Sequence, residues 1–368
     1  MAQVERGGSW SDRLGDVLRI MRDMGDYAEE REVDAIFILG DLFNRANPDG
    51  PSVVYACAVL SAISKHCPVY ILPGNHDAVD PQGRLYNVHF LRALGVPDIH
   101  VLNRSTHLFG GRVVVHPLPY VPEARAARQI ASIQKNMDEA DVNILLMHQS
   151  VMGARLESGM ASAGGLDPEE TTKGFAAVYS GHFHRSQTFG RCGRYLGSPL
   201  DLRFGDEDVD FRGYWEITIN LDGEIDEELI YADYPRFCTV KFEYGAGECD
   251  EHNFEEEIES ALDEFCQTHY RHDDDDAEPQ YIRIVMTGPA YMVDKAMREA
   301  SHWASQNETR FRVVKIICDP TREEVLRLDV PGPTDLVSLP AIVRAYGERY
   351  LDNNQELIEL GLSFLGDE

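Results

Sequence analysis

Four short apolar segments of the sequence each run into residues that can bind a metal ion. The segments and the residues that follow them are IFILGD ending at Asp41, VYILPGNHD with Asn75, His76 and Asp77, NILLMH ending at His148, and AAVYSGHFH with His182 and His184. Apolar runs of this length are typical of buried strands, and active sites of layered α/β proteins lie at the carboxyl ends of such strands. Carboxylate, amide and imidazole groups that converge there could hold two divalent ions, with a carboxylate bridging both.

The chemistry of GNHD separates three roles. Asn75 offers a carbonyl oxygen as a neutral ligand, and His76 is free to meet a phosphate or a leaving oxygen. Asp77 is expected to orient the His76 imidazole and support its protonated form. The alternative for His76 is a helix-capping histidine.

Three further histidines are judged by spacing and context. His182 and His184 are two residues apart, so on an extended backbone both would point the same way and could serve neighbouring ions. His116 ends the strand-like run GRVVVHPLPY, and we expect a hydrogen-bonded structural histidine rather than a ligand.

Helical patterns alternate with these strands. Residues Ser11–Glu30, Val53–His66 and Ala124–Ala140 are predicted as helices, which indicates a layered α/β domain. The residues expected to face the sheet from the second helix are Val54, Ala58, Leu60 and Ile63. Residues Gln149–Phe175 show little periodicity and are expected to form a surface loop beside the site.

The motifs GDLFN, GNHD, a lone histidine after a strand, and GHFH occur in the order found in calcineurin-like metallophosphoesterases, which the chain resembles over about Asp34–Phe211. The following segment, Tyr195–Ile217, resembles the SbcD-type nuclease subunits of double-strand-break repair, including phage versions. The resemblance implies a layered α/β β-sandwich flanked by helices, followed by a small α+β capping domain and a C-terminal helical tail.

The resemblance also implies two divalent ions, with manganese expected and magnesium as the alternative. One ion is expected to bind Asp41, Asn75, His148 and His182, while the second shares Asp41 and adds His184. Water activated at the ions would attack the phosphodiester in line, and His76 would stabilise the developing charge or protonate the leaving oxygen. Arg203 and Arg212 could touch DNA phosphates, although exposed arginines in turns are usually just solvated.

One family feature is missing from the sequence. The family opens with an apolar strand ending in Asp-x-His, and nothing in Met1–Trp10 matches it, while Asp12 and Asp16 lie in a helical pattern. We therefore expect either that the natural protein begins further upstream or that this chain is a variant with one strong metal site. In either case this chain should bind a second ion weakly.

The sequence divides at about residue 236, where a β-α-β-α-β pattern begins. We expect a metallophosphoesterase domain at 1–235, a capping domain that helps to present DNA at 236–320, and a helical tail at 321–368. His252, His269 and His272 lie near an acidic run and are expected to be solvated rather than ligands. The tail helices have apolar faces that either bind an SbcC-type coiled-coil ATPase or dock on the chain's own body.

Composition narrows the class of protein. With 368 residues, 43% of them hydrophobic, and no apolar run of membrane-spanning length, the chain is expected to be cytoplasmic, with no membrane partner. Seven cysteines without CxxC spacing argue against a disulfide framework or a structural zinc site. The formal charge of −29 is unusual for a DNA-binding protein, so metal ions, a partner subunit or a salty cell interior would have to compensate.

These observations favour a metal-dependent DNA exonuclease or endonuclease subunit that acts in repair or recombination with an SbcC-type ATPase. The alternatives are a catalytically crippled structural subunit of the same complex and a phosphoesterase acting on small nucleotides or phosphoproteins. A homodimer is left open.

Overall fold

The chain folds into two compact units. The computed structural model describes residues 2–7, 10–103, 105–108, 112–137, 142–156, 159–207, 212–220, 222–244, 253–269, 279, 281–307, 309–311 and 313–320. The larger unit comprises Gly8–Cys238 and Phe265–Tyr281, and the smaller one contains the described residues of Met1–Gly7, Thr239–Glu264 and Ile282–Glu368. The expected C-terminal helical tail lies outside the described residues.

The larger unit contains three sheets. A parallel three-stranded sheet has the order β2 (Ile36–Leu39), β3 (Val69–Leu72) and β4 (Ile99–Val101). A six-stranded sheet has the order β5 (Thr106–Leu108), β6 (Val113–Leu118), β7 (Val142–Met147), β8 (Ala177–Ser180), β10 (Gly193–Tyr195) and β9 (Gln187–Phe189). The third sheet is the hairpin of β11 (Gly213–Ile219) and β12 (Ile225–Tyr231).

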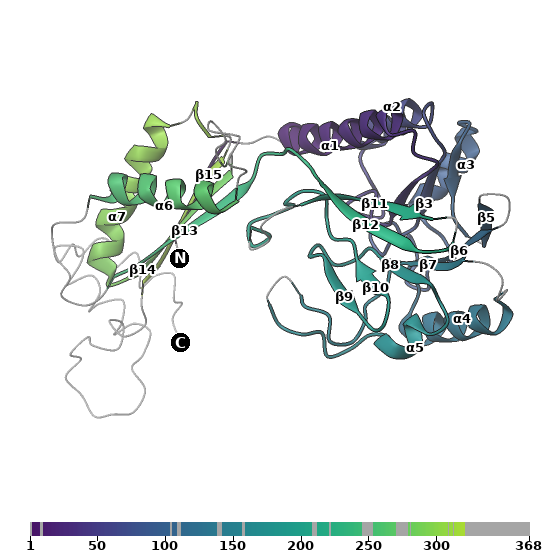
Figure 1. Ribbon diagram of the computed structural model, residues 1–368. Helices are drawn as coiled ribbons and strands as arrows, with labels where there is room; N and C mark the ends of the chain where they lie inside the picture. Colours follow the sequence, from purple (N-terminus) through teal and green to yellow (C-terminus); the bar gives the residue numbers. More distant parts are fainter. Residues whose placement is uncertain are drawn as a thin grey trace, which may run out of the picture. The chain divides into compact units, whose positions relative to one another are not determined.

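Helices cover both sides of these strands. They are α1 (Trp10–Glu30), α2 (Gly50–Ile63), the 3-10 turn η1 (Asn87–His89), α3 (Phe90–Leu94), α4 (Glu123–Asn136) and α5 (Pro168–Thr172). Figure 1 shows α1 and α2 along one side of the larger unit and α4 and α5 along the other, with the strands between them.

The buried side chains confirm a layered sandwich. Along β7, Ile144 and Leu146 belong to the cluster shared with β2 and β3, whereas Leu145 and Met147 belong to the cluster shared with α4. This alternation follows from the two-residue period of a strand that is buried on both faces. The predicted α/β sandwich flanked by helices is therefore confirmed.

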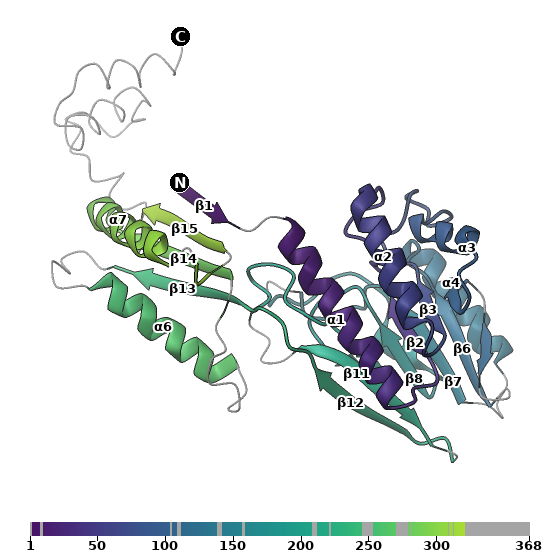
Figure 2. The same ribbon diagram turned by 90° about the horizontal axis from the view of Figure 1, so that it is seen from above.

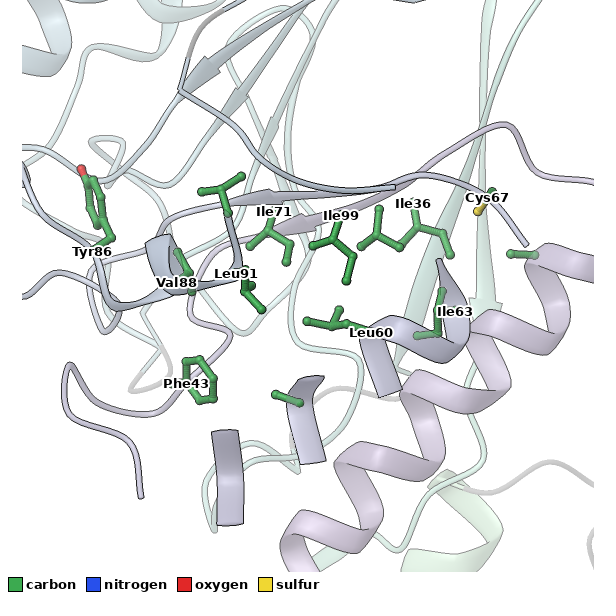
Figure 3. Close-up of a cluster of buried hydrophobic side chains, with 14 residues drawn as sticks. Ile36, Phe43, Leu60, Ile63, Cys67, Ile71, Tyr86, Val88, Leu91 and Ile99 are labelled. Carbon is green, nitrogen blue, oxygen red and sulfur yellow. The ribbon is translucent and has the colours of Figure 1, made fainter. Parts of the chain in front are cut away.

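The cluster between α2 and the parallel sheet corrects the predicted face of that helix. Figure 3 shows Leu60 and Ile63 pointing at Ile36, Ile71 and Ile99 of the strands. Ala56 is the third buried residue of α2, while Val54 is 66% exposed and Ala58 is also exposed. Positions 56, 60 and 63 lie on one stripe at steps of four and three, but positions 54 and 58 lie on a neighbouring stripe.

The segment predicted as a surface loop has buried anchor residues. In residues 149–175, Val151, Ala154 and Leu166 are buried in the cluster under α4. Val151 forms a bridge with Leu166, and α5 closes the segment. The sequence did not predict this burial, because isolated apolar residues between glycines and serines form no periodic hydrophobic pattern.

The smaller unit has the predicted β-α-β-α-β order. It contains most of β13 (Phe237–Glu243), α6 (Phe254–His269) and β14 (Tyr281–Gly288), together with α7 (Ala290–Gln306) and β15 (Val313–Pro320), which Figure 2 shows from above. A hydrogen bond joins the two helices, since Trp303 Nε1 of α7 donates to Glu259 Oε1 of α6 at 2.8 Å. Arg310, which follows α7, binds both oxygens of the same carboxylate.

A fourth strand joins this sheet from the start of the chain. Strand β1 (Ala2–Gly7) pairs antiparallel with β15, from Ala2 opposite Cys318 to Gly7 opposite Val313. The sequence did not predict it, because edge pairing needs only backbone donors and acceptors and AQVERG contains a single large apolar residue. In the larger unit, strand β2 lies at the edge of the three-stranded sheet β2-β3-β4.

The prediction for the histidines near the acidic run falls outside the described residues, which include neither His252 nor His272, nor the side chain of His269. Among the helices that the structure does describe, none combines the length and apolarity that a bilayer crossing requires.

Candidate metal centre

The site begins at the tight turn that follows β2. Gly40 and Asp41 both have a positive φ, at 93° and 55°. A Cβ at Gly40 would collide with His148 Nδ1, and one at Gly74 would collide with the Asp41 carboxylate, so both glycines are required by close approach. The turn brings the Asp41 side chain beside the residues that follow β3 and β7.

Asp77 holds this turn in place. Its buried carboxylate accepts the backbone N–H of Asp41 at 2.9 Å and of Gly74 at 2.8 Å on Oδ2, and of Phe43 at 3.4 Å on Oδ1. Burial raises the pKa of Asp77, the backbone donors oppose this, and the neighbouring charge of Asp41 adds to the rise. The expected pairing with the His76 imidazole is not what the structure shows: Asp77 positions the backbone of two loops.

His148 presents one nitrogen to the site. The residue is 1% exposed, and Nδ1 lies 2.7 Å from the backbone carbonyl oxygen of Leu39, to which it must donate a proton. In a neutral imidazole this leaves a lone pair on Nε2. Nε2 lies 2.9 Å from Asn75 Oδ1 and 3.3 Å from Asp41 Oδ2.

His182 reaches the same point from the other side. Its Nδ1 lies 2.9 Å from Asn75 Oδ1, and its Nε2 lies 2.9 Å from Ser150 Oγ. Burial, together with the neighbouring His148, lowers the pKa of His182 to about 4. At neutral pH His182 is therefore uncharged, which is the form that binds metal ions.

These side chains fit a divalent cation. Asn75 Oδ1 lies between two imidazole nitrogens, and Asp41 adds a carboxylate oxygen beside them. In the neutral form of His148 with its proton on Nδ1, Nε2 and Asn75 Oδ1 are two acceptors that lie side by side, and a shared cation would satisfy both. Among the described residues, no three His, Cys, Asp or Glu side chains by themselves surround a common ion position. The set of candidate ligands therefore includes the amide oxygen of Asn75.

The electrostatics of Asp41 agree with this assignment. Burial would raise the pKa of its carboxyl group, but the hydrogen bond and charge of His148 and the backbone N–H of His76 outweigh burial and lower it. The His76 N–H donates to Asp41 Oδ1 at 2.9 Å. Asp41 is therefore ionised at neutral pH and available as a ligand.

The backbone between His182 and His184 is not an extended strand. The positive φ of 87° at His182 breaks the extended backbone on which the two side chains were expected to point the same way. His184 Nδ1 lies 3.6 Å from Asp206 Oδ2, and that carboxylate is buried. The structure thus brings together Asp41, Asn75, His148 and His182 and gives His184 a carboxylate neighbour of its own.

His76 is exposed at the edge of the site. Its Nδ1 lies 2.8 Å from the carbonyl oxygen of Asn44, so the Nδ1–H donates there and Nε2 faces outward. Asn44 is the last residue of GDLFN. Its role could not be predicted from the sequence, because a residue of any type can supply a backbone carbonyl acceptor. Ser150, the partner of His182, was missed for a similar reason: it follows His148 by two residues in a segment without periodicity.

The two arginines named from the sequence have different environments. Arg212 is buried and donates from Nε to Asp201 Oδ1 at 2.6 Å, from Nη1 to the His184 carbonyl at 2.6 Å and from Nη2 to the Asp206 carbonyl at 2.7 Å. Its guanidinium is thus committed to protein oxygens, and we do not propose it as a phosphate contact. Arg203 is 59% exposed, with Nε 3.9 Å from Asp206 Oδ1.

His116 lies in the core, as the sequence indicated. Its Nδ1 is 3.0 Å from Ser105 Oγ and its Nε2 is 2.8 Å from Asn143 Oδ1. Both nitrogens are therefore satisfied within the protein, which makes His116 a useful control for the site histidines.

The chain was compared with known protein families. Residues 10–186 match the model of the calcineurin-like phosphoesterase family. Members of this family hydrolyse phosphoesters with divalent metal ions.

Several individual proteins are similar to the chain. "DNA double-strand break repair protein Mre11" of Sulfurisphaera tokodaii is 23% identical over 343 residues, which cover 89% of this chain and 81% of that protein. A subunit of the nuclease SbcCD of Bacillus subtilis is 24% identical over 261 residues, covering 60% of this chain and 64% of that protein. "Putative phosphoesterase 078R" of Invertebrate iridescent virus 3 is 25% identical over 179 residues, covering 48% and 50% of the two chains.

Proposed function

We propose that the protein is a metal-dependent DNA nuclease subunit that hydrolyses phosphodiester bonds during repair or recombination. The observation that carries this proposal is the convergence of His148 Nε2 and His182 Nδ1 on Asn75 Oδ1, beside the ionised Asp41. Oxygen and imidazole donors of this kind suit manganese, with magnesium as the alternative.

A divalent cation bound there would polarise the phosphate and make water a better nucleophile. The chain's own residues prepare the site for this. Asp77 fixes the turn that carries Asp41, and the Leu39 carbonyl fixes the tautomer of His148. Such supporting contacts orient ligands and tune their basicity.

His76 has the geometry of an acid or a phosphate donor. Because the Asn44 carbonyl takes the Nδ1–H, the exposed Nε2 is the nitrogen that can hold a proton toward substrate. A positioned group of this kind usually contributes 10²- to 10⁴-fold to the rate. We assign His76, rather than Asp77, the role of direct contact with the reacting phosphate.

The choice of DNA as substrate is supported by the names of the relatives, two of which are a double-strand-break repair protein and part of a nuclease. We further propose that the domain at 236–320, whose sheet also includes β1 of residues 2–7, helps to present DNA, and that residues 321–368 bind an SbcC-type ATPase. The charge of −29 supports a partner that supplies basic surface, because nucleic-acid binding alone favours the opposite sign.

A second candidate is a subunit with one strong metal site and little activity. The observation that favours it is the position of His184, whose Nδ1 lies 3.6 Å from Asp206 Oδ2, while the other four proposed ligands lie together. In that case Asp41 and His184 would bind a second ion only weakly.

The test compares two buried histidines. Hydrolysis of bis(p-nitrophenyl) phosphate and of linear DNA is measured with Mn²⁺ or Mg²⁺ for the wild type, His148→Gln and the control His116→Gln. We expect metal-dependent hydrolysis of both substrates that His148→Gln abolishes and His116→Gln retains.

Hydrolysis of the small ester but not of DNA would overturn the nuclease assignment and favour a phosphoesterase of small molecules. Binding of Mn²⁺ without hydrolysis of either substrate would favour the weakly active subunit. Equal activity of the wild type and His148→Gln would contradict the site itself.

A further inference from the structure

Ser150 is held rigidly against the back of His182. Leu166 N–H donates to the Ser150 carbonyl at 2.9 Å, which pins the backbone of Ser150. The preceding residue, Gln149, is fixed by its side-chain donation to the Pro119 carbonyl at 3.0 Å and by the Tyr195 hydroxyl at 2.8 Å. The Ser150 hydroxyl consequently stays 2.9 Å from His182 Nε2.

The two neighbours of the His182 ring differ in what they can accept or donate. A neutral imidazole has one N–H and one lone pair. Asn75 Oδ1, next to Nδ1, can only accept, whereas the Ser150 hydroxyl, next to Nε2, can donate or accept. The hydroxyl therefore satisfies Nε2 in either tautomer.

Cation binding requires one of these tautomers. If Nδ1 is to give its lone pair to an ion, the proton must move to Nε2, and a partly buried N–H there favours an acceptor. The contact of Nε2 in the structure is the Ser150 hydroxyl. Without the ion, Nδ1–H can donate to Asn75 Oδ1, and the hydroxyl can turn round and donate to Nε2.

We propose that Ser150 is a positioning residue that sets the tautomer of His182, accepting the Nε2–H so that Nδ1 is free to bind the divalent cation. The inference rests on the proposed function, since it takes His182 as a ligand, and adds a residue outside the set named from the sequence. Its hydroxyl acts through His182 and touches neither the cation nor the substrate.

The chain offers a matched control. Ser105 Oγ lies 3.0 Å from His116 Nδ1, so a second serine–histidine pair exists away from the site. We compare Ser150→Ala, Ser150→Thr and Ser105→Ala with the wild type. The affinity for Mn²⁺ alone is measured by calorimetry, and thermal unfolding followed by circular dichroism verifies folding.

Loss of a supporting hydrogen bond to a ligating histidine typically weakens metal binding 10- to 100-fold. We expect a loss in this range for Ser150→Ala, restoration to within about threefold by the hydroxyl of Ser150→Thr, and no change for Ser105→Ala. Wild-type affinity in Ser150→Ala would overturn the inference while leaving the metal site intact. Absence of Mn²⁺ binding in the wild type would overturn the proposed function as well.

A spectroscopic readout keeps the proposal testable should Ser150→Ala fold poorly. Long-range ¹⁵N–¹H spectra of the wild-type histidines are recorded with and without diamagnetic Mg²⁺. We expect His182 to carry its proton on Nε2 when Mg²⁺ is bound. A proton on Nδ1 in the Mg²⁺-bound protein would contradict the role of Ser150.

Discussion

Asp77→Ala is expected to destabilise the larger unit because it removes the acceptor shared by two loops. The carboxylate accepts N–H groups of Asp41 and Gly74 at 2.9 and 2.8 Å, and of Phe43 at a longer 3.4 Å. Each buried donor left without a partner costs about 1–3 kcal/mol. Two short bonds and one long one, offset in part by lost repulsion from Asp41, give an expected loss of about 3 kcal/mol.

The matched variant is Asp77→Asn. Its single side-chain oxygen can occupy the position of Oδ2 and keep both short bonds, and it removes the negative charge beside Asp41. We expect it to lose about 1 kcal/mol, the value of one ordinary hydrogen bond.

Urea denaturation followed by tryptophan fluorescence gives the free energies of unfolding of the wild type and both variants. If Asp77→Ala were as stable as the wild type but slow in hydrolysis, Asp77 would act on His76, as the sequence alone suggested. Our assignment of a positioning role would then be refuted.

Two further predictions concern the supports of the site. Arg212→Ala leaves the buried Asp201 carboxylate without its nearest cation and should lower the free energy of unfolding in urea by about 3–5 kcal/mol. Replacing the exposed Arg203 by Ala should change this free energy by less than about 0.5 kcal/mol. Near-equal losses in the two variants would contradict the prediction. Burial raises the pKa of Tyr86 to about 12, so folding stability from its neutral phenol is fully present below pH 10 and is lost as pH rises toward 12. Tyr86→Phe should flatten this alkaline decline by on the order of 2 kcal/mol in denaturation curves between pH 9 and 12, and an unchanged slope would count against it.

The strand positions, and four of the side chains that lie together at the site, could be predicted from the sequence because each depends on a local pattern. An apolar run followed at once by Asp, Asn or His indicates a strand and a side chain at its carboxyl end. Asp41, Asn75, His148 and His182 meet as that pattern implies.

The remaining features depend on tertiary contacts that have no local pattern. The spacing of His182 and His184 predicted parallel side chains on an extended backbone, but the positive φ of His182 shows that the backbone is not extended there. The partner of His76 is a backbone carbonyl and the partners of Asp77 are backbone N–H groups, neither of which has a sequence signature. Strand β1 joins the sheet of β15 through backbone pairing alone.

Calorimetric titration of the purified chain with Mn²⁺ tests the central claim most directly. We predict one tightly bound ion, a second that binds far more weakly, and loss of the tight site in Asn75→Ala, because Asn75 Oδ1 is the atom on which both imidazoles converge. His116→Gln should bind Mn²⁺ like the wild type. Unchanged stoichiometry and affinity in Asn75→Ala would show that these side chains do not hold the ion and would contradict the account.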